Sequence, residues 1–102
     1  MPLPGSCSAA EVRAAYSDHI FPAIRAFQPD FIMISAGFDG HLADPLSDFP
    51  LTDEDFVWLT RQIMELAEKL CSKRLISTLE GGYNLRALAN ASAQHVQALM
   101  QA

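Results

Sequence analysis

Two short apolar runs limit what this chain can fold into. Residues 30–35 and 74–79 are too short for helices, and each leads into a glycine-containing loop. A longer segment with helical periodicity separates them. A strand–helix–strand order predicts a right-handed crossover between two parallel strands, which is typical of α/β folds.

Three stretches repeat apolar residues with helical spacing. The first follows Ser8, which heads a capping-box pattern, and Pro22 predicts a kink or two helices meeting near Phe21. The second begins at Thr52, followed by acidic residues that the helix dipole favours, and the third begins near Asn84. The faces expected to be buried are Val12, Tyr16, Ile20, Ala23 and Phe27; Phe56, Leu59, Ile63, Leu66 and Leu70; and Leu85, Leu88, Ser92, Val96 and Leu99.

The loops that leave the two expected strands meet at one edge of the sheet, because parallel strands have their carboxyl ends together. These loops are residues 37–51 and 80–83. Open α/β sheets bind ligands at that edge. Two strands alone leave sheet edges and helix faces uncovered. The sequence therefore predicts a piece of a larger α/β domain or an obligate subunit, for which a homo-oligomer is one arrangement.

Composition excludes several functions. The 102 residues carry a net charge of -5 with a pI near 4.9 and no basic cluster, which argues against nucleic-acid binding. No apolar run approaches the roughly 20 residues needed to span a bilayer, so no membrane partner is expected.

The amino terminus lacks signal-peptide features. Cys7 and Cys71 have no metal-binding spacing and favour a reducing compartment, the cytoplasm or, in a eukaryote, the nucleus.

The first loop contains Asp39, His41 and Asp44 within six residues. Aspartates in such loops commonly form turns and caps. The same three side chains are alternatively a metal-ligand set, because carboxylate and imidazole both suit zinc. Ser35 with His41 suggests a nucleophile and a base, but no GxSxG elbow surrounds that serine. The first two interpretations both stay open.

The second loop is Glu80-Gly81-Gly82-Tyr83. One interpretation is a flexible strand-to-helix turn in which the tyrosine packs or caps. In the other, the glycines let a ligand approach the backbone, while the Tyr83 hydroxyl donates a hydrogen bond to a developing oxyanion. His95, on the last helical stretch, is expected to be a packing residue.

Three segments, SAGFDGHLADPL, LTDEDF and STLEGGYNL, occur in this order. Together they resemble the C-terminal portion of the histone deacetylase superfamily, in the branch of class II deacetylases, bacterial deacetylase-like amidohydrolases and acetylpolyamine amidohydrolases. The resemblance implies part of a three-layer α/β/α arginase/deacetylase fold with a parallel sheet. Residues 1–102 would be the C-terminal part of an incomplete domain, containing only its last βαβ unit and flanking helices.

The resemblance also implies roles for individual residues. Asp39 would be one of three protein ligands of a catalytic Zn2+, which is expected only in the complete domain. Tyr83 would polarise the substrate carbonyl and hold the oxyanion. Leu46 would line the acyl-lysine tunnel, with Gly81 and Gly82 at its floor.

The implied reaction is zinc-assisted hydrolysis of the amide of an acetylated amine, such as acetyl-lysine or an acetylpolyamine. The family's tandem catalytic histidines and its Asp-x-His ligand pair are absent here. His41 does not belong to that pair, and Asp44 is expected to hold the loop. The isolated chain is therefore expected to be inactive and to need the rest of the domain.

Two alternatives remain. The chain could be a non-catalytic remnant or interaction subunit that pairs with a partner chain through its open sheet edge. An arginase-like metallohydrolase shares the fold, but it is disfavoured because that family lacks the Gly-Gly-Tyr segment.

Overall fold

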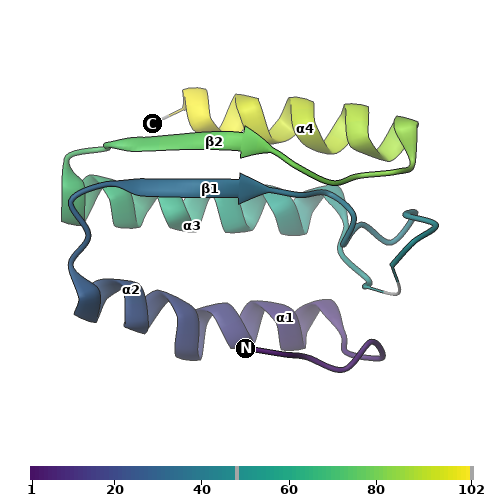
Figure 1. The fold of residues 1–102 in the computed structure, drawn as a ribbon, viewed down its shortest axis with the longest axis horizontal. Helices are drawn as coiled ribbons and strands as arrows, with labels where there is room; N and C mark the ends of the chain where they lie inside the picture. Colours follow the sequence, from purple (N-terminus) through teal and green to yellow (C-terminus); the bar gives the residue numbers. More distant parts are fainter. Residues whose placement is uncertain (48, 102) are drawn as a thin grey trace.

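The computed structural model describes residues 1–47 and 49–101 as a two-stranded parallel sheet flanked by helices (Figure 1). Asp48, in the first predicted loop, and Ala102, the last residue of the predicted partial domain, lie outside the described residues. The elements are α1 (Ala9–Ala15), the π-helix η1 (Tyr16–Ile20), α2 (Phe21–Phe27), β1 (Ile32–Ala36), α3 (Asp53–Cys71), β2 (Leu75–Leu79) and α4 (Leu85–Met100). The predicted alternation and the parallel pairing are confirmed.

Within the described residues, helices cover one face of the sheet and leave the other bare. Strands β1 and β2 pair with Ile32 opposite Leu75 and Met33 opposite Ile76. Helices α3 and α4 lie together behind this sheet, while α1 and α2 run alongside β1 (Figure 1). Met33 and Ile76 point away from α3 and α4 and are 69% and 49% exposed. Parallel sheets are normally covered on both faces, and this bare face lacks such a cover among the described residues.

The first helical stretch changes its hydrogen-bond pattern just before the predicted junction near Phe21, while the backbone of Ala15, Ile20 and Phe21 stays right-handed helical. The N–H of Phe21 donates to the carbonyl of Tyr16, five residues earlier, so the helix widens into a π-turn between α1 and α2. Pro22 stands in the first turn of α2, where its missing N–H costs no helical hydrogen bond. Ser8 caps α1 as predicted.

The expected buried faces of α3 and α4 are each confirmed in part, and Leu88 of α4 packs against the core. Phe56 and Leu66 are buried on α3, but Leu85 and Val96 of α4 are 81% and 51% exposed. The residues that α4 buries are Ala87, Ala91, His95 and Ala98. Helix α4 is apolar on two faces, and its close approach to α3 selects the face with small side chains. In the first helical stretch Phe27 is also exposed, at 80%.

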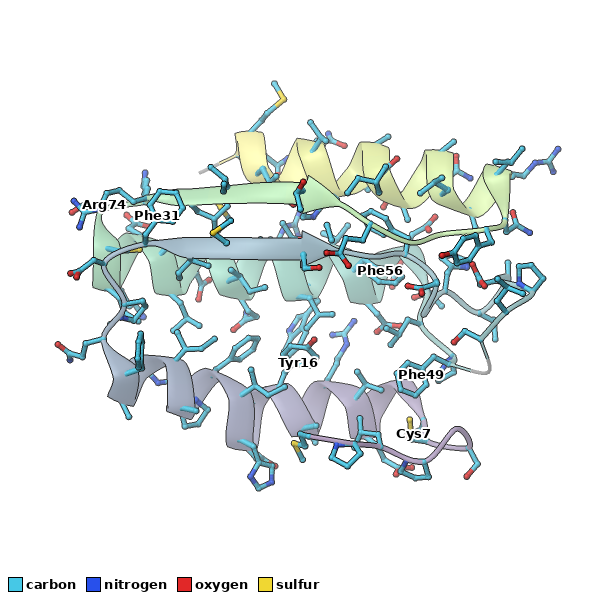
Figure 2. The ribbon with its side chains drawn as sticks, in the orientation of Figure 1. Cys7, Tyr16, Phe31, Phe49, Phe56 and Arg74 are labelled. Carbon is cyan, nitrogen blue, oxygen red and sulfur yellow. The ribbon has the colours of Figure 1, made fainter. Side chains whose placement is uncertain are left out.

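The core lies toward the carboxyl ends of the strands. Its buried members are Cys7, Val12, Ala36, Phe38, Leu51, Phe56 and Ala91. Figure 2 shows Cys7, Phe49 and Phe56 at this end of the molecule, with Phe31 and Arg74 at the opposite end. The loop between β1 and α3 is thus anchored in the core. Within the described ranges, no helix is long and apolar enough to cross a membrane.

Candidate functional site

The two loops meet at the carboxyl edge of the sheet, as predicted. The N–H of Phe38 donates to the carbonyl of Gly81 at 2.8 Å. A Cβ atom added to Gly81 would lie 2.9 Å from Cγ of Asp39, and one added to Gly37 would lie 2.9 Å from its Oδ1. Real Cβ atoms do not approach other atoms so closely. Glycine at both positions therefore makes room for the Asp39 carboxylate.

Gly82 is required for a different reason. Its φ angle is +140°, in the region that residues with a side chain rarely adopt, and an added Cβ would lie 2.9 Å from Cδ1 of Leu88. The glycine pair after β2 thus combines a close approach by Asp39 with a backbone turn. The sequence suggested close approach at these glycines, but not that a carboxylate of the same chain makes it.

Asp39 lines a cavity of about 350 Å³ between α1, β1 and α3. Its side chain is partly exposed, and among the described residues none donates a hydrogen bond to its carboxylate. The neighbouring carboxylates of Asp44, Asp53 and Asp55 all accept hydrogen bonds. Asp39 is therefore a carboxylate at this edge whose oxygens can take a cation or an outside donor.

Asp44 holds the two loops together. It is 6% exposed. Its Oδ1 accepts from the N–H of Leu46 and its Oδ2 from the N–H of Tyr83, both at 2.8 Å. With both oxygens engaged, Asp44 has the loop-holding position that the sequence indicated.

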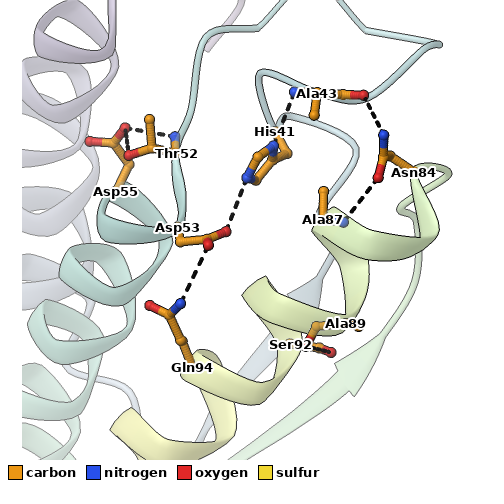
Figure 3. A network of polar contacts seen from close by, with 10 residues as sticks. All are labelled: His41, Ala43, Thr52, Asp53, Asp55, Asn84, Ala87, Ala89, Ser92 and Gln94. Carbon is orange, nitrogen blue, oxygen red and sulfur yellow. Dashed lines mark hydrogen bonds and ion pairs between the residues drawn. The ribbon is translucent and has the colours of Figure 1, made fainter.

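His41 is also committed to the loop. Its Nδ1 accepts from the N–H of Ala43 at 3.0 Å, so the ring proton belongs on Nε2, which donates to Asp53 at 3.0 Å (Figure 3). Asp53 accepts a further hydrogen bond from Gln94 of α4. The imidazole stacks on Phe56 with 6.2 Å between ring centroids. His41 thus ties the loop to the start of α3.

The interpretation of Asp39, His41 and Asp44 as one metal-ligand set is wrong. The hydrogen bonds above engage the last two, leaving only the first with uncommitted oxygens. Across residues 1–47 and 49–101, no three His, Cys, Asp or Glu side chains are grouped to hold a metal ion. A carboxylate can serve as one zinc ligand, so Asp39 fits a site whose other ligands lie elsewhere.

Tyr83 and Leu46 project from neighbouring turns. Their side chains are 55% and 72% exposed, although both main-chain N–H groups are fixed by Asp44. The edge therefore presents a carboxylate, a phenol and an aliphatic side chain, the last two on turns whose main chain is hydrogen-bonded to Asp44. This combination can bind a cation, donate a hydrogen bond to an oxyanion and contact an apolar chain.

His95 is a packing residue, as expected, but its polar role had no sequence signal. The Thr60 hydroxyl donates to the carbonyl of Phe56, so Nδ1 of His95 donates to that hydroxyl and Nε2 accepts from Ser77, both at 2.8 Å. Burial lowers the pKa of His95, which keeps the imidazole neutral. Its ring packs edge-on against Phe38, the residue before Asp39, at 5.7 Å. His95 therefore supports the site from beneath.

The chain resembles known proteins along almost its whole length. Residues 1–99 match the model of the histone deacetylase domain family. Histone deacetylase 10, chloroplastic, of Oryza sativa subsp. japonica is 40% identical over 98% of this chain and 23% of the relative. The crystal structure of the HDA15 HD domain has a TM-score of 0.82 at 32% identity, over 94% of this chain and 27% of that one. The histone deacetylase Clr3 has a TM-score of 0.85 at 27% identity, over 99% and 17%. The chain spans less than a quarter of the length of the rice relative.

Proposed function

Because the chain belongs to the histone deacetylase family, we propose that it forms one wall of a zinc-dependent amide hydrolase site. Its fold is part of the arginase/deacetylase fold. The observation that carries the proposal is the contact between the Asp39 carboxylate and Gly81, with 2.9 Å from Cγ to an added Cβ. That contact brings the Asp39 carboxylate beside the turn that presents Tyr83, which supports the proposal.

Asp39 is the proposed zinc ligand. Its carboxylate accepts no hydrogen bond from a described residue and borders a cavity, whereas its neighbours are engaged. Zinc, when bound, would polarise the substrate carbonyl and activate water. Catalytic zinc takes three protein ligands. We therefore place the other two ligands and the general-base histidine in the remainder of the deacetylase domain, and expect the chain by itself to be inactive.

Tyr83 is the proposed catalytic donor. Its hydroxyl would donate a hydrogen bond to the substrate oxygen and hold the negative charge that develops there. A fixed donor is effective because it needs no reorganisation during the reaction, and the main chain of Tyr83 is tied to Asp44 at 2.8 Å. The exposed phenol would reach the substrate from this anchored turn.

Leu46, Gly81 and Gly82 are the proposed contacts for the acyl chain. Leu46 is 72% exposed, and an aliphatic wall suits the methylenes of an acetylated lysine or polyamine. The glycines keep the floor free of side chains. The substrate is therefore proposed to be an acetylated amine, with neither nucleic acid nor membrane required.

The bare sheet face supports an incomplete domain. Met33, Ile76 and Phe31 are 69%, 49% and 47% exposed. We propose that the rest of a deacetylase domain covers them.

The cytoplasm is the proposed compartment, since Cys7 and Cys71 are buried free thiols.

The test grafts this chain into the rice relative in place of the segment that it matches. With the graft active on an acetyl-lysine peptide, Tyr83→Phe should lower kcat by about 100-fold or more at unchanged zinc content, because only the oxyanion donor is lost. Asp39→Ala should lower both zinc content and turnover. Full zinc occupancy in Asp39→Ala, or normal turnover in Tyr83→Phe, would contradict the assigned roles.

A second candidate function is an interaction subunit without catalysis. The exposed apolar sheet face favours it, because such a face suits a partner chain or a second copy of this chain. An inactive graft that still folds and binds zinc would favour this alternative. Deacetylation by the graft would exclude it.

A further inference from the structure

We propose that Asp44 is a positioning residue that sets Tyr83 and Leu46 relative to one another, an inference that rests on the proposed function. One carboxylate reaches both loops, since Oδ2 accepts from the N–H of Tyr83 and Oδ1 from the N–H of Leu46, each at 2.8 Å. The proposed oxyanion donor and the proposed tunnel residue therefore share a single anchor.

The chemistry of this anchor requires a carboxylate. An ionised carboxylate has two acceptor oxygens in one plane, whereas an amide of the same shape has one acceptor and one donor group. Hydrogen bonds to a charged acceptor are about twice as strong as neutral ones. Asp44 is 6% exposed, so water competes little for its oxygens. Asparagine at this position would keep the shape and lose one of the two bonds.

Further contacts between the same loops add to the hydrogen bonds of Asp44. We call the contacts of Asp44, Asn84 and His41 together the clamp. Asn84, next to Tyr83, donates from Nδ2 to the carbonyl of Ala43 at 3.1 Å, and its Oδ1 caps α4 at the N–H of Ala87 (Figure 3). His41 accepts from the N–H of the same Ala43. The clamp acts on main-chain atoms and leaves the side chains of Tyr83 and Leu46 exposed. A shift of one turn must therefore move the other.

Amide hydrogen exchange in this chain tests the clamp without relying on activity. Asp44→Ala should speed exchange at Tyr83 and Leu46 by roughly 10- to 100-fold, and Asp44→Asn should do so at one of the two. Asp30→Asn, a change of an exposed carboxylate before β1, is the matched control and should leave both rates unchanged. Amides of α3 report that the variants fold. If Asp44→Ala unfolds the chain, Asp44→Asn decides, and unchanged rates at both amides would overturn the proposal.

The active graft tests positioning. Asp44→Asn should lower kcat by about 10- to 100-fold and raise KM at unchanged zinc content, because misplacing Tyr83 affects the transition state and misplacing Leu46 affects substrate binding. A graft in which Tyr83→Phe abolishes turnover but Asp44→Asn changes neither constant would overturn the inference. If Tyr83→Phe itself has no effect, the proposed function fails, and the exchange rates alone decide whether Asp44 couples the loops.

Discussion

The two ends of the sheet are built differently. At the carboxyl end, polar side chains tie the loops to each other and to both covering helices, through Asp44, His41 and Asn84. At the amino end, Phe27 and Phe31 are 80% and 47% exposed, and the side chain of Arg74 holds the carbonyl of Asp30. Directional hydrogen bonds fix positions, whereas apolar contacts require a covering partner. The hydrogen bonds of this chain thus hold its proposed site wall, whereas no described residue covers Phe27 and Phe31 at the other end.

The largest expected loss of stability comes from a substitution that removes side-chain hydrogen bonds near the carboxyl end of the sheet. His95→Ala should lower the free energy of unfolding by about 3 kcal/mol, because it leaves the hydroxyls of Ser77 and Thr60 without the imidazole and opens a cavity. Urea unfolding of the purified chain measures it. A loss below about 0.5 kcal/mol, the usual range for surface changes, would mean that the buried network adds little.

Acidification should cause a smaller loss of stability, again through a side chain at the carboxyl end of the sheet. Burial acts to raise the pKa of Asp55, but hydrogen bonds from Thr52 and Arg13 outweigh it, so the pKa lies below its usual value. A lowered carboxyl pKa stabilises the fold above the unfolded value near ~4, and this stabilisation is lost as pH falls through the folded pKa. Unfolding curves below about pH 5 should show this loss. Asp55→Asn should remove its share of the pH dependence, and an unchanged pH profile in that variant would contradict the assignment.

The smallest effect is expected at the bare face. Met33→Ser should change the stability of this chain by less than about 0.5 kcal/mol, because Met33 is 69% exposed. In the active graft the same change should cost about 2 kcal/mol or more if the rest of the domain covers that face. Thermal unfolding of both proteins makes the comparison. Equal small effects would show that the face stays uncovered in the graft.

Patterns between near neighbours in sequence predicted most of the fold. The strand–helix–strand order, the cap at Ser8 and the helix junction near Phe21 each depend on residues within a few positions. The meeting of the loops that carry Asp39 and Tyr83 followed from parallel strand direction, a rule of topology. The buried face of α4 was predicted only in part, because two of its faces are apolar and packing against α3 selects between them.

The candidate residues divide in the same way. Sequence alone determined that glycines, an aspartate and a tyrosine would gather at one edge, because their types and order are local. The tertiary structure decided what each polar group contacts: Asp44 meets the N–H of Tyr83 across 39 positions, and His95 meets Thr60 across 35. Hydrogen bonds depend on distances and angles that no local pattern encodes. For that reason only the structure shows the hydrogen bonds that engage His41 and Asp44, the two residues that spacing alone grouped with Asp39 as metal ligands.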